Sequence, residues 1–331
     1  MALALARTAP AVENAALPGR SYSAIAAGTL TIALFALTPS TTRLAVGQIS
    51  GFDIGIFRTV GGGLLALPII LIFRLRGPQS LADWGLLAVS AFGCFLGFPI
   101  LFSLGTEYTS ASHAALIMAT LPLFTGGIGM LLERRAPRAA WFVGSAIAVV
   151  GEAVLALSGK RPATGDSSLI GDALVLLSCI AFAFGVVAGA RLTARINPWS
   201  ATFWGIAMAS ACLIPLAVMR GPAIAWTTLS ATTWAALFHL TVGATILAYV
   251  AWFWALSRGG IARIAPLQFV QPGLALLFAA AIVHEPLPPQ LALVAALIIP
   301  GVAMACRACR PGRNAGAERL HTNSSSLMAT Q

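Results

Sequence analysis

The sequence is divided into apolar runs long enough to cross a lipid bilayer, separated by short polar connections. A membrane-spanning helix needs about 20 mostly apolar residues, and ten such runs fit into the 331 residues. They cover residues 22–42, 51–73, 82–103, 112–132, 139–158, 170–191, 198–219, 230–256, 261–283 and 289–308. Because a single apolar run satisfies its backbone hydrogen bonds in lipid by forming a helix, the sequence predicts an all-α integral membrane protein with ten transmembrane helices.

The composition excludes a water-soluble protein. Hydrophobic residues make up 58% of the chain and charged residues 9%, whereas soluble domains carry about 25% charged residues. The net charge of +10 is spread singly and in pairs between the apolar runs. A nucleic-acid-binding surface would gather those charges into one patch, so the expected partners are the lipid bilayer and a small-molecule substrate, and no nucleic acid.

The basic residues also orient the predicted helices. If the N-terminus is cytoplasmic, the alternating loops place fifteen of the 20 basic residues on the cytoplasmic side. These are Arg7, Arg20, Arg74, Arg76, Arg134, Arg135, Arg138, Arg191, Arg195, Arg258, Arg263, Arg307, Arg310, Arg313 and Arg319. Short cytoplasmic loops are enriched in Lys and Arg, so both termini are expected to be cytoplasmic.

The two ends and the cysteines add no further site. Residues 1–21 are expected to be a disordered leader and residues 309–331 a disordered tail. Cys306 and Cys309 form an isolated C-x-x-C pair, whereas a zinc site needs about four ligands. We therefore expect no metal and no cofactor.

The second half of the chain repeats the first at an offset of 150 residues. Four identities share this offset: Trp84 with Trp234, Gly93 with Gly243, Pro122 with Pro272, and Gly151 with Gly301. The offset predicts one five-helix repeat over residues 22–158, a connection at 159–169 and a second repeat over 170–308. Because each repeat has an odd number of helices, the second enters the membrane inverted, as in many secondary transporters.

Basic residues and prolines at matching places carry a resemblance to a known family. Arg43 lies late in the first helix and Arg58 in the second, while Pro122 with Glu133, and Pro272 with Glu285, mark the fourth helix of each half. In these features the chain resembles the EamA family of the drug/metabolite transporter superfamily.

The resemblance extends over about residues 22–306. It implies a multi-pass transporter of the inner (plasma) membrane, which exports amino acids and related metabolites or carries other small solutes. It also implies a central substrate cavity, with the third, fourth, eighth and ninth helices prominent in its wall. The family often has W-G-x-x-F-x-x-x-K in the first helix, where this chain has Phe35, Ala36, Pro39 and Arg43.

The ninth predicted helix carries two amides beside a proline. Gln268 and Gln271 are three residues apart and share a helix face. Pro272 cannot donate a backbone hydrogen bond, so the carbonyl near Gln268 is expected to be free. Such groups in the membrane face either a neighbouring helix or a cavity. We predict that both glutamines bind substrate, Gln271 foremost.

The eighth predicted helix has a polar and aromatic face. Thr241, Thr245, Tyr249 and Trp252 follow helical spacing. This face could bind an amphipathic or aromatic substrate, and it could equally serve helix packing, with Trp252 in the interfacial aromatic belt. Thr245, Tyr249 and Trp252 are taken as substrate-binding candidates, and His239 as a packing residue with satisfied hydrogen bonds.

The two arginines near the outer ends of the first two helices have different expected roles. Arg43 is a candidate for a substrate carboxylate, because Arg suits bidentate carboxylate binding, or it extends to the headgroups. For Arg58 we expect a structural role, either reaching the headgroups or pairing with Asp53.

Ionisable residues could couple transport to protons. Glu152, inside the fifth run, and His113, near Glu107 at the start of the fourth, are the candidates, with a structural role as the alternative for each. Glu133 and Glu285 lie at helix ends and are expected to be structural.

The sequence predicts a secondary transporter, as a monomer or homodimer. The alternatives are an intramembrane enzyme, a non-transporting membrane scaffold and, among transporters, a carrier of drugs or other small organic solutes. An enzyme has little support, since His284-Glu285 lacks the second histidine of H-E-x-x-H and no G-x-S-x-G occurs. No catalytic residue is predicted.

Overall fold

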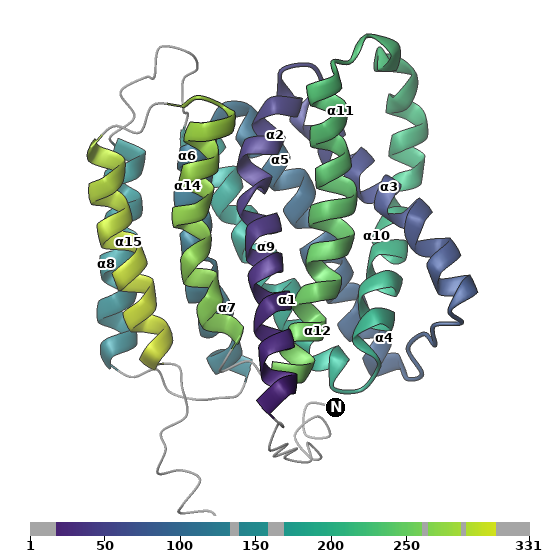
Figure 1. Cartoon of the computed structure of the whole chain (residues 1–331), viewed down its shortest axis with the longest axis horizontal. Helices are drawn as coiled ribbons and strands as arrows, with labels where there is room; N and C mark the ends of the chain where they lie inside the picture. The colour runs from purple at the N-terminus through teal and green to yellow at the C-terminus, as the bar shows by residue number, and fades with distance from the viewer. Residues whose placement is uncertain (1–17, 133–138, 158–168, 260–263, 286–288, 309–331) are drawn as a thin grey trace, which may run out of the picture.

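The computed structural model describes residues 18–132, 139–157, 169–259, 264–285 and 289–308, and every regular element in these ranges is helical (Figure 1). The elements of the first half are α1 (Pro18–Ala36), α2 (Thr38–Val46), α3 (Gly51–Ile72), α4 (Leu81–Ser90), η2 (Ala91–Gly97), α5 (Phe98–Tyr108), α6 (Ala111–Ile117), η3 (Met118–Thr120), α7 (Leu121–Leu132) and α8 (Ala139–Leu157). Those of the second half are α9 (Leu169–Thr193), α10 (Pro198–Arg220), η4 (Gly221–Ala223), η5 (Trp226–Thr228), α11 (Ala231–Phe238), η6 (His239–Leu247), α12 (Ala248–Gly259), η7 (Ala265–Val270), α14 (Gln271–Ile282) and α15 (Pro289–Ala308).

Seven helical stretches within the described residues are long and apolar enough to cross a membrane. They are Tyr22–Val46, Gly51–Ile72, Leu81–Tyr108, Ala111–Leu131, Leu169–Thr193, Pro198–Ala223 and Ala231–Gly259. Two shorter apolar helices, Ala139–Gly151 and Gln271–Ile282, fall in the fifth and ninth predicted runs, and α15 fills the tenth. The prediction of an all-α, multi-pass membrane protein is confirmed.

Serine residues define where several of these helices begin. The hydroxyl of an N-cap serine accepts a hydrogen bond from a backbone N–H of the first turn, which would otherwise lack a partner. Four serines do so here, each to the residue three positions later and at 3.1–3.2 Å: Ser50, Ser80, Ser110 and Ser230. Ser80 and Ser230 are 150 residues apart, so the predicted repeat extends to the caps.

Two of the long helices contain a π-helical segment at the same point. The segment η2 interrupts the helix Leu81–Tyr108, and η6 interrupts Ala231–Gly259. At the end of each, a backbone N–H bonds the carbonyl five residues earlier: Phe98 to Gly93, and Ala248 to Gly243. These pairs also lie 150 residues apart. A π-helical turn changes which side chains share a face of a helix. The prediction of regular α-helical spacing from Thr241 to Trp252 is therefore wrong, because η6 covers the first part of that stretch.

The predicted proline interruption recurs in both halves. Pro122 and Pro272 are the second residues of α7 and α14, and each follows a 3₁₀ segment, η3 or η7. The expectation of a free carbonyl near Gln268 is wrong, because that carbonyl accepts the N–H of Gln271. The tighter 3₁₀ turn supplies the hydrogen bond that the proline cannot.

Helices from the two halves pack against one another throughout the fold. The main partners are α3 with α10, α5 with α9, α1 with α12, and α8 with α15, the last pair at the left of Figure 1. Glycine allows the closest approach: a Cβ at Gly93 would lie 2.4 Å from the carbonyl oxygen of Ala181 and 2.7 Å from Cα of Gly185. Because these contacts cross between halves, neither half buries its core alone.

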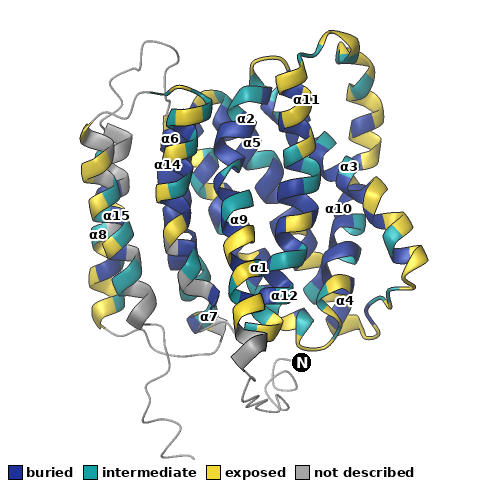
Figure 2. Ribbon diagram, viewed as in Figure 1, coloured by how far each residue is buried: buried dark blue, intermediate teal, exposed yellow. Residues whose placement is uncertain are grey.

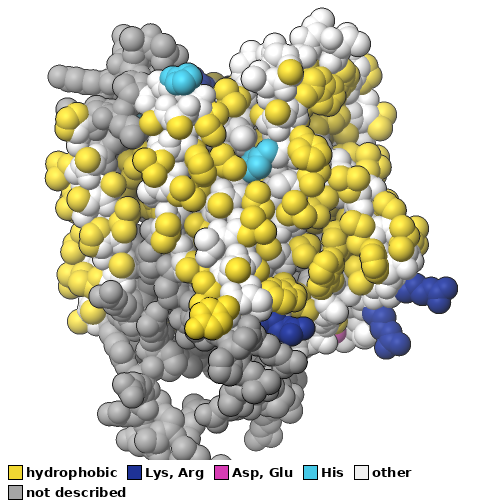
Figure 3. All heavy atoms as spheres, in the orientation of Figure 1, with side chains coloured by type: hydrophobic (Ala, Val, Ile, Leu, Met, Phe, Trp, Pro, Cys, Tyr) yellow, Lys and Arg dark blue, Asp and Glu magenta, His cyan; other side chains and the backbone are white. Residues whose placement is uncertain are grey.

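Buried residues concentrate inside the helix bundle and apolar side chains cover its outside (Figures 2 and 3). Leu64, Leu71 and Phe92 are each more than half exposed. In water such a surface would be unfavourable, whereas against lipid chains it is the expected surface of a membrane protein.

Candidate functional site

Arg58 is the most deeply buried charged side chain that the structure describes. It lies on α3, is 1% exposed, and meets Thr245 of η6. Its Nε and Nη2 atoms each lie 3.3 Å from the Thr245 hydroxyl oxygen, and its Nη1 has no hydrogen-bond partner among the described residues. A guanidinium that brings five donor hydrogens to one hydroxyl is poorly satisfied.

All five acidic side chains that the structure describes are engaged elsewhere. Asp53 accepts hydrogen bonds from Arg220, one of them at 3.0 Å from Nη2, and Asp83 accepts one from Arg195 at 3.0 Å. The other three acids are Glu107, Asp172 and Glu285, whose partners are backbone N–H groups, hydroxyls or His113. Among the side chains that the structure describes, therefore, Arg58 has no counter-ion.

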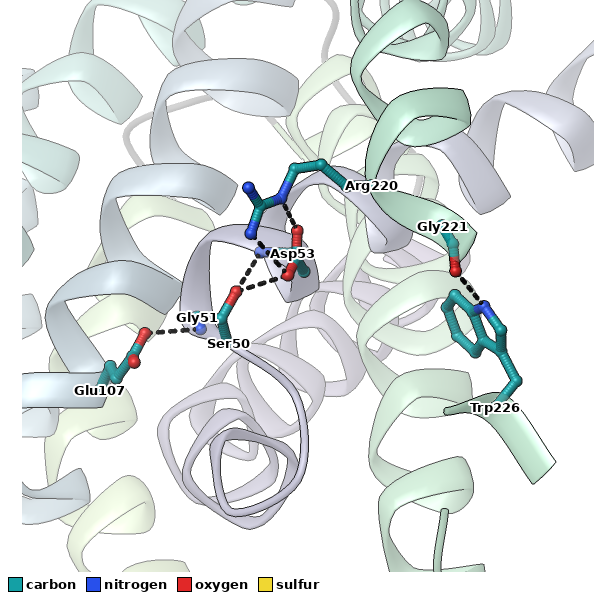
Figure 4. A network of polar contacts seen from close by, with 7 residues as sticks. All are labelled: Ser50, Gly51, Asp53, Glu107, Arg220, Gly221 and Trp226. Atoms are coloured by element: carbon teal, nitrogen blue, oxygen red, sulfur yellow. Dashed lines mark hydrogen bonds and ion pairs between the residues drawn. The ribbon is translucent and has the colours of Figure 1, made fainter. Parts of the chain in front are cut away.

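The Asp53 network replaces the ion pair expected between Asp53 and Arg58 (Figure 4). Asp53 lies in the first turn of α3 and pairs with Arg220 in the last turn of α10, while the Ser50 hydroxyl donates to Asp53 at 2.7 Å. The Glu107 carboxylate accepts the N–H of Gly51 at 2.7 Å. The prediction that Arg58 pairs with Asp53 or reaches the headgroups is thus wrong.

Both π-helical segments provide backbone carbonyls as acceptors for side-chain hydroxyls. The Tyr249 hydroxyl donates to the carbonyl of Cys94 at 2.9 Å, and the Thr59 hydroxyl donates to that of Phe95 at 2.7 Å. The Thr245 hydroxyl donates to the carbonyl of Leu240 at 2.8 Å, so its oxygen faces Arg58 as an acceptor. Of these hydroxyls, that of Thr245 on η6 is the one that Arg58 contacts among the described residues.

Aromatic side chains pack around Tyr249. The Tyr249 ring packs against Phe95, Phe35 and Phe182, with centroids 4.5, 5.3 and 6.1 Å apart. Trp252, one turn further along α12, is 2% exposed, and its indole N–H has no partner among the described residues. The expected belt position of Trp252 is therefore wrong.

An apolar pocket lies beside η2. It is a groove of about 450 Å³ on the outside of the bundle, lined by Ala88, Val89, Phe92, Gly93, Ala181 and Phe184. Its lining is apolar and includes the exposed Phe92 ring. Such a groove fits a lipid chain, and it offers no polar group to orient a solute.

The structure buries the three predicted substrate-binding residues of the eighth predicted helix. These are Thr245, Tyr249 and Trp252, of which Thr245 contacts Arg58. Gln268 and Gln271 are also buried, at 8% and 5% exposed. They lie on η7 and α14, which pack against α1, α2 and α6.

Arg43 belongs to α2, and its side chain reaches the C-terminal end of α5. Its Nη1 donates to the carbonyls of Thr106 and Glu107 at 3.4 and 3.5 Å. A cation at the C-terminal end of α5 is favourable for the helix dipole. This placement gives Arg43 protein partners in addition to its predicted role towards substrate.

Of the two predicted proton-coupling residues, the structure describes the side chain of His113 and not that of Glu152. His113 is paired with Asp172, with Nδ1 and Oδ2 3.3 Å apart. The side chains of Glu152 and Glu133 lie outside the described residues. Glu285 accepts hydrogen bonds from the backbone N–H groups of Ala111 and Ser112 at 2.8 and 2.9 Å, which is the structural role expected of it.

His239 only partly fits its expected role. Its Nδ1 lies 3.1 Å from the Thr41 hydroxyl, which links η6 to α2. Its Nε2 has no hydrogen-bond partner among the described residues. The expectation of a fully satisfied histidine is therefore wrong at Nε2.

Sequence reasoning missed Arg58 as a site residue although a signal was present. Residues five apart on an α-helix are separated by about 140° around its axis, so Asp53 and Arg58 lie on different faces. Side chains three or four apart are the ones that meet. Helical geometry alone therefore argues against an ion pair between Asp53 and Arg58. Arg58 is then a charged residue within an apolar run, and such a residue is by default a candidate for a functional role.

Comparison with known proteins identifies a family. The model described as the EamA-like transporter family matches residues 22–157 and again residues 169–307. The uncharacterized transporter YdeK of Bacillus subtilis (strain 168) is 31% identical over 283 residues, which cover 85% of this chain and 96% of that protein. An uncharacterized transporter of Archaeoglobus fulgidus is 25% identical over 244 residues, covering 72% and 81% of the two chains.

A solved crystal structure shares the fold. It superimposes with a TM-score of 0.60 at 21% identity and covers 86% of this chain and 96% of its own. At this identity the likeness extends to the fold alone.

Proposed function

The chain belongs to the EamA-like transporter family, and from that premise we propose that it is a secondary transporter that exports amino acids or related small metabolites by alternating access. The observation that carries the proposal is the double family match, with one match on each half of the chain. The unpaired Arg58 at the contact between halves adds a polar centre where a solute can be held.

The proposed architecture has ten transmembrane helices in two inverted repeats, over residues 22–158 and 170–308. The π-helical segments, the proline interruptions and the N-cap serines that recur at the 150-residue offset all support it. In such a fold an in-plane axis relates the halves, and exchanging their conformations opens a central site to one side and then the other.

A pair of cross-half contacts gives this symmetry independent support. Asp83 in the first turn of α4 accepts a hydrogen bond from Arg195 in the connection before α10. In the other half, Thr233 in the first turn of α11 donates to Gln48 in the connection before α3, at 2.6 Å. The two contacts occupy equivalent places, and Figure 1 shows α4 and α11 beginning at opposite ends of the bundle.

We further propose that the protein lies in the inner (plasma) membrane with both termini cytoplasmic. The first turn of α1 and the last turn of α15 lie at the same end, the lower one in Figure 1. Five described arginines lie in the last turn of a helix that ends there or in the connection just after it: Arg74, Arg76, Arg191, Arg195 and Arg258. Enrichment of arginine on one side indicates the cytoplasmic side. The protein acts as a monomer or homodimer.

Reconstitution tests the proposed function. Purified protein in liposomes loaded with labelled amino acids should release them faster than protein-free liposomes, at each of two pH values. If release across a broad amino-acid panel is no faster than from the protein-free liposomes, amino-acid export is contradicted. A further panel of organic solutes then separates a drug carrier from a scaffold or an enzyme, for which no solute would move.

A further inference from the structure

We propose that Arg58 binds an anionic group, foremost a carboxylate, on the transported solute, and that Thr245 positions the guanidinium for it. This inference rests on the proposed transport function and names the chemical class of its substrate. It also assigns the substrate-binding role to a residue of α3, in addition to those on α12 and α14.

The first argument is the charge that Arg58 leaves uncompensated. A buried cation is costly unless it is paired and hydrogen-bonded, and arginine remains charged in proteins. Every described acid is bound to another group, and the helices that pack closely on α3 include α10, α5, α2 and η6, none of which offers Arg58 an acid. A solute carboxylate would supply the missing negative charge.

The second argument is geometric. Arg58 is seven residues into α3, which places it about 10 Å along the helix from its start. Snorkelling to the headgroups at that depth would leave some of the side chain exposed, but it is 1% exposed. The guanidinium therefore points into the bundle, with Nη1 free to donate.

The third argument is that a solute carboxylate could replace the Thr245 hydroxyl as the partner of Arg58. Its Nε and Nη2 share one neutral acceptor, the Thr245 hydroxyl. Beside it, Gly62 leaves η6 close to α3, since a Cβ there would lie 3.1 Å from the Thr245 methyl group. Movement of η6 away from α3 would free Nε and Nη2. Two of the three guanidinium nitrogens could then donate to the two oxygens of a carboxylate in the bidentate geometry.

Matched acids and amides provide the test. Labelled L-alanine, L-leucine and L-phenylalanine are compared with their carboxamides, which keep the side chain and amine but lack the negative charge. For wild-type protein in liposomes we expect transport of at least one of the acids and about tenfold less of its amide. The Tm of the detergent-purified protein in the presence of each compound measures binding independently of transport.

Variants assign the effect to Arg58. Arg58→Gln should abolish the preference for acid over amide, and Arg58→Lys should retain part of it, because lysine keeps the charge and loses the planar fork. Arg258→Gln removes an exposed arginine that stacks on Trp254, and should leave the preference unchanged. Thr245→Ala keeps Arg58 and tests positioning, through a raised KM at similar membrane expression.

The outcomes separate the two proposals. Equal transport of acids and amides by the wild type overturns the carboxylate inference and leaves the transport function standing. An unchanged acid preference in Arg58→Gln also overturns it. If no compound crosses the membrane, amino-acid transport fails, while stabilisation by the acids alone in the unfolding measurement would still support the anion site.

Discussion

The hydroxyl of Tyr249 donates a hydrogen bond to the carbonyl of Cys94, 2.9 Å away, and so joins the helix that follows one π-helical segment to the other π-helical segment. Both residues are buried, at 1% and 0% exposed. A buried backbone carbonyl needs a hydrogen-bond donor, and here a side chain from the opposite half donates to one.

Tyr249→Phe should destabilise the protein while keeping its aromatic packing. The variant leaves the buried Cys94 carbonyl without the hydroxyl, which typically costs about 1–3 kcal/mol. Thermal unfolding in detergent should show a lower Tm than the wild type. Tyr22→Phe is the matched control, because Tyr22 is 75% exposed. An equal Tm for Tyr249→Phe and wild type would mean that the bond contributes nothing.

Gly93→Ala should disrupt packing between η2 and α9. The added Cβ would lie 2.4 Å from the carbonyl oxygen of Ala181, and neither backbone can yield without moving its helix. We expect a marked loss of folded protein in size-exclusion chromatography. Gly85→Ala is the control: nothing lies within 4 Å of its Cβ, and alanine in a helix is worth up to about 1 kcal/mol over glycine. If the two variants behaved alike, the close approach at Gly93 would be unimportant.

Glu285→Ala should cost more stability than Glu107→Ala. Glu285 accepts three hydrogen bonds at the start of α6, from the N–H groups of Ala111 and Ser112 and from the Ser112 hydroxyl. Glu107 accepts one described bond, from the N–H of Gly51. Capping interactions are worth about 0.5–2 kcal/mol each, so the order of the two Tm values tests the assignment, and the reverse order would contradict it.

The inverted repeat predicts that equivalent connections face opposite sides of the membrane. In a cysteine-free background, Gln79→Cys lies before α4 and Thr228→Cys before α11, and both native side chains are exposed. A membrane-impermeant maleimide added to intact cells should label Thr228→Cys, and should label Gln79→Cys only after lysis. Labelling of both positions from one side would remove the proposed topology.

Much of the fold could be predicted from the sequence because the bilayer restricts what an apolar run can become. The long helices, the interruptions at Pro122 and Pro272, and the structural role of Glu285 all followed from length, backbone chemistry and position. The 150-residue offset predicted equivalent positions, and the π-helical segments later fell on them. Periodicity of 3.6 residues could not reveal those segments, since they depart from it.

The candidate site was harder to predict, because it depends on which partners remain free. The sequence shows Asp53 near Arg58 in number, whereas its partner, Arg220, comes from a helix 167 residues away. Only the folded chain shows that each described acid is already bound. Arg58 therefore becomes a candidate because every described acid is bound to another group, and no local sequence pattern reveals that.

The cap that Glu285 places on α6 also has a consequence for synthesis. The two backbone N–H groups it satisfies belong to residues 174 and 173 positions earlier in the chain. When the first half enters the bilayer, the start of α6 has no such acceptor, and it gains one only after most of the second half has been translated. The Ser110 hydroxyl caps α6 from within the first half, but these two N–H groups wait for Glu285, so the start of α6 is completed only late in synthesis.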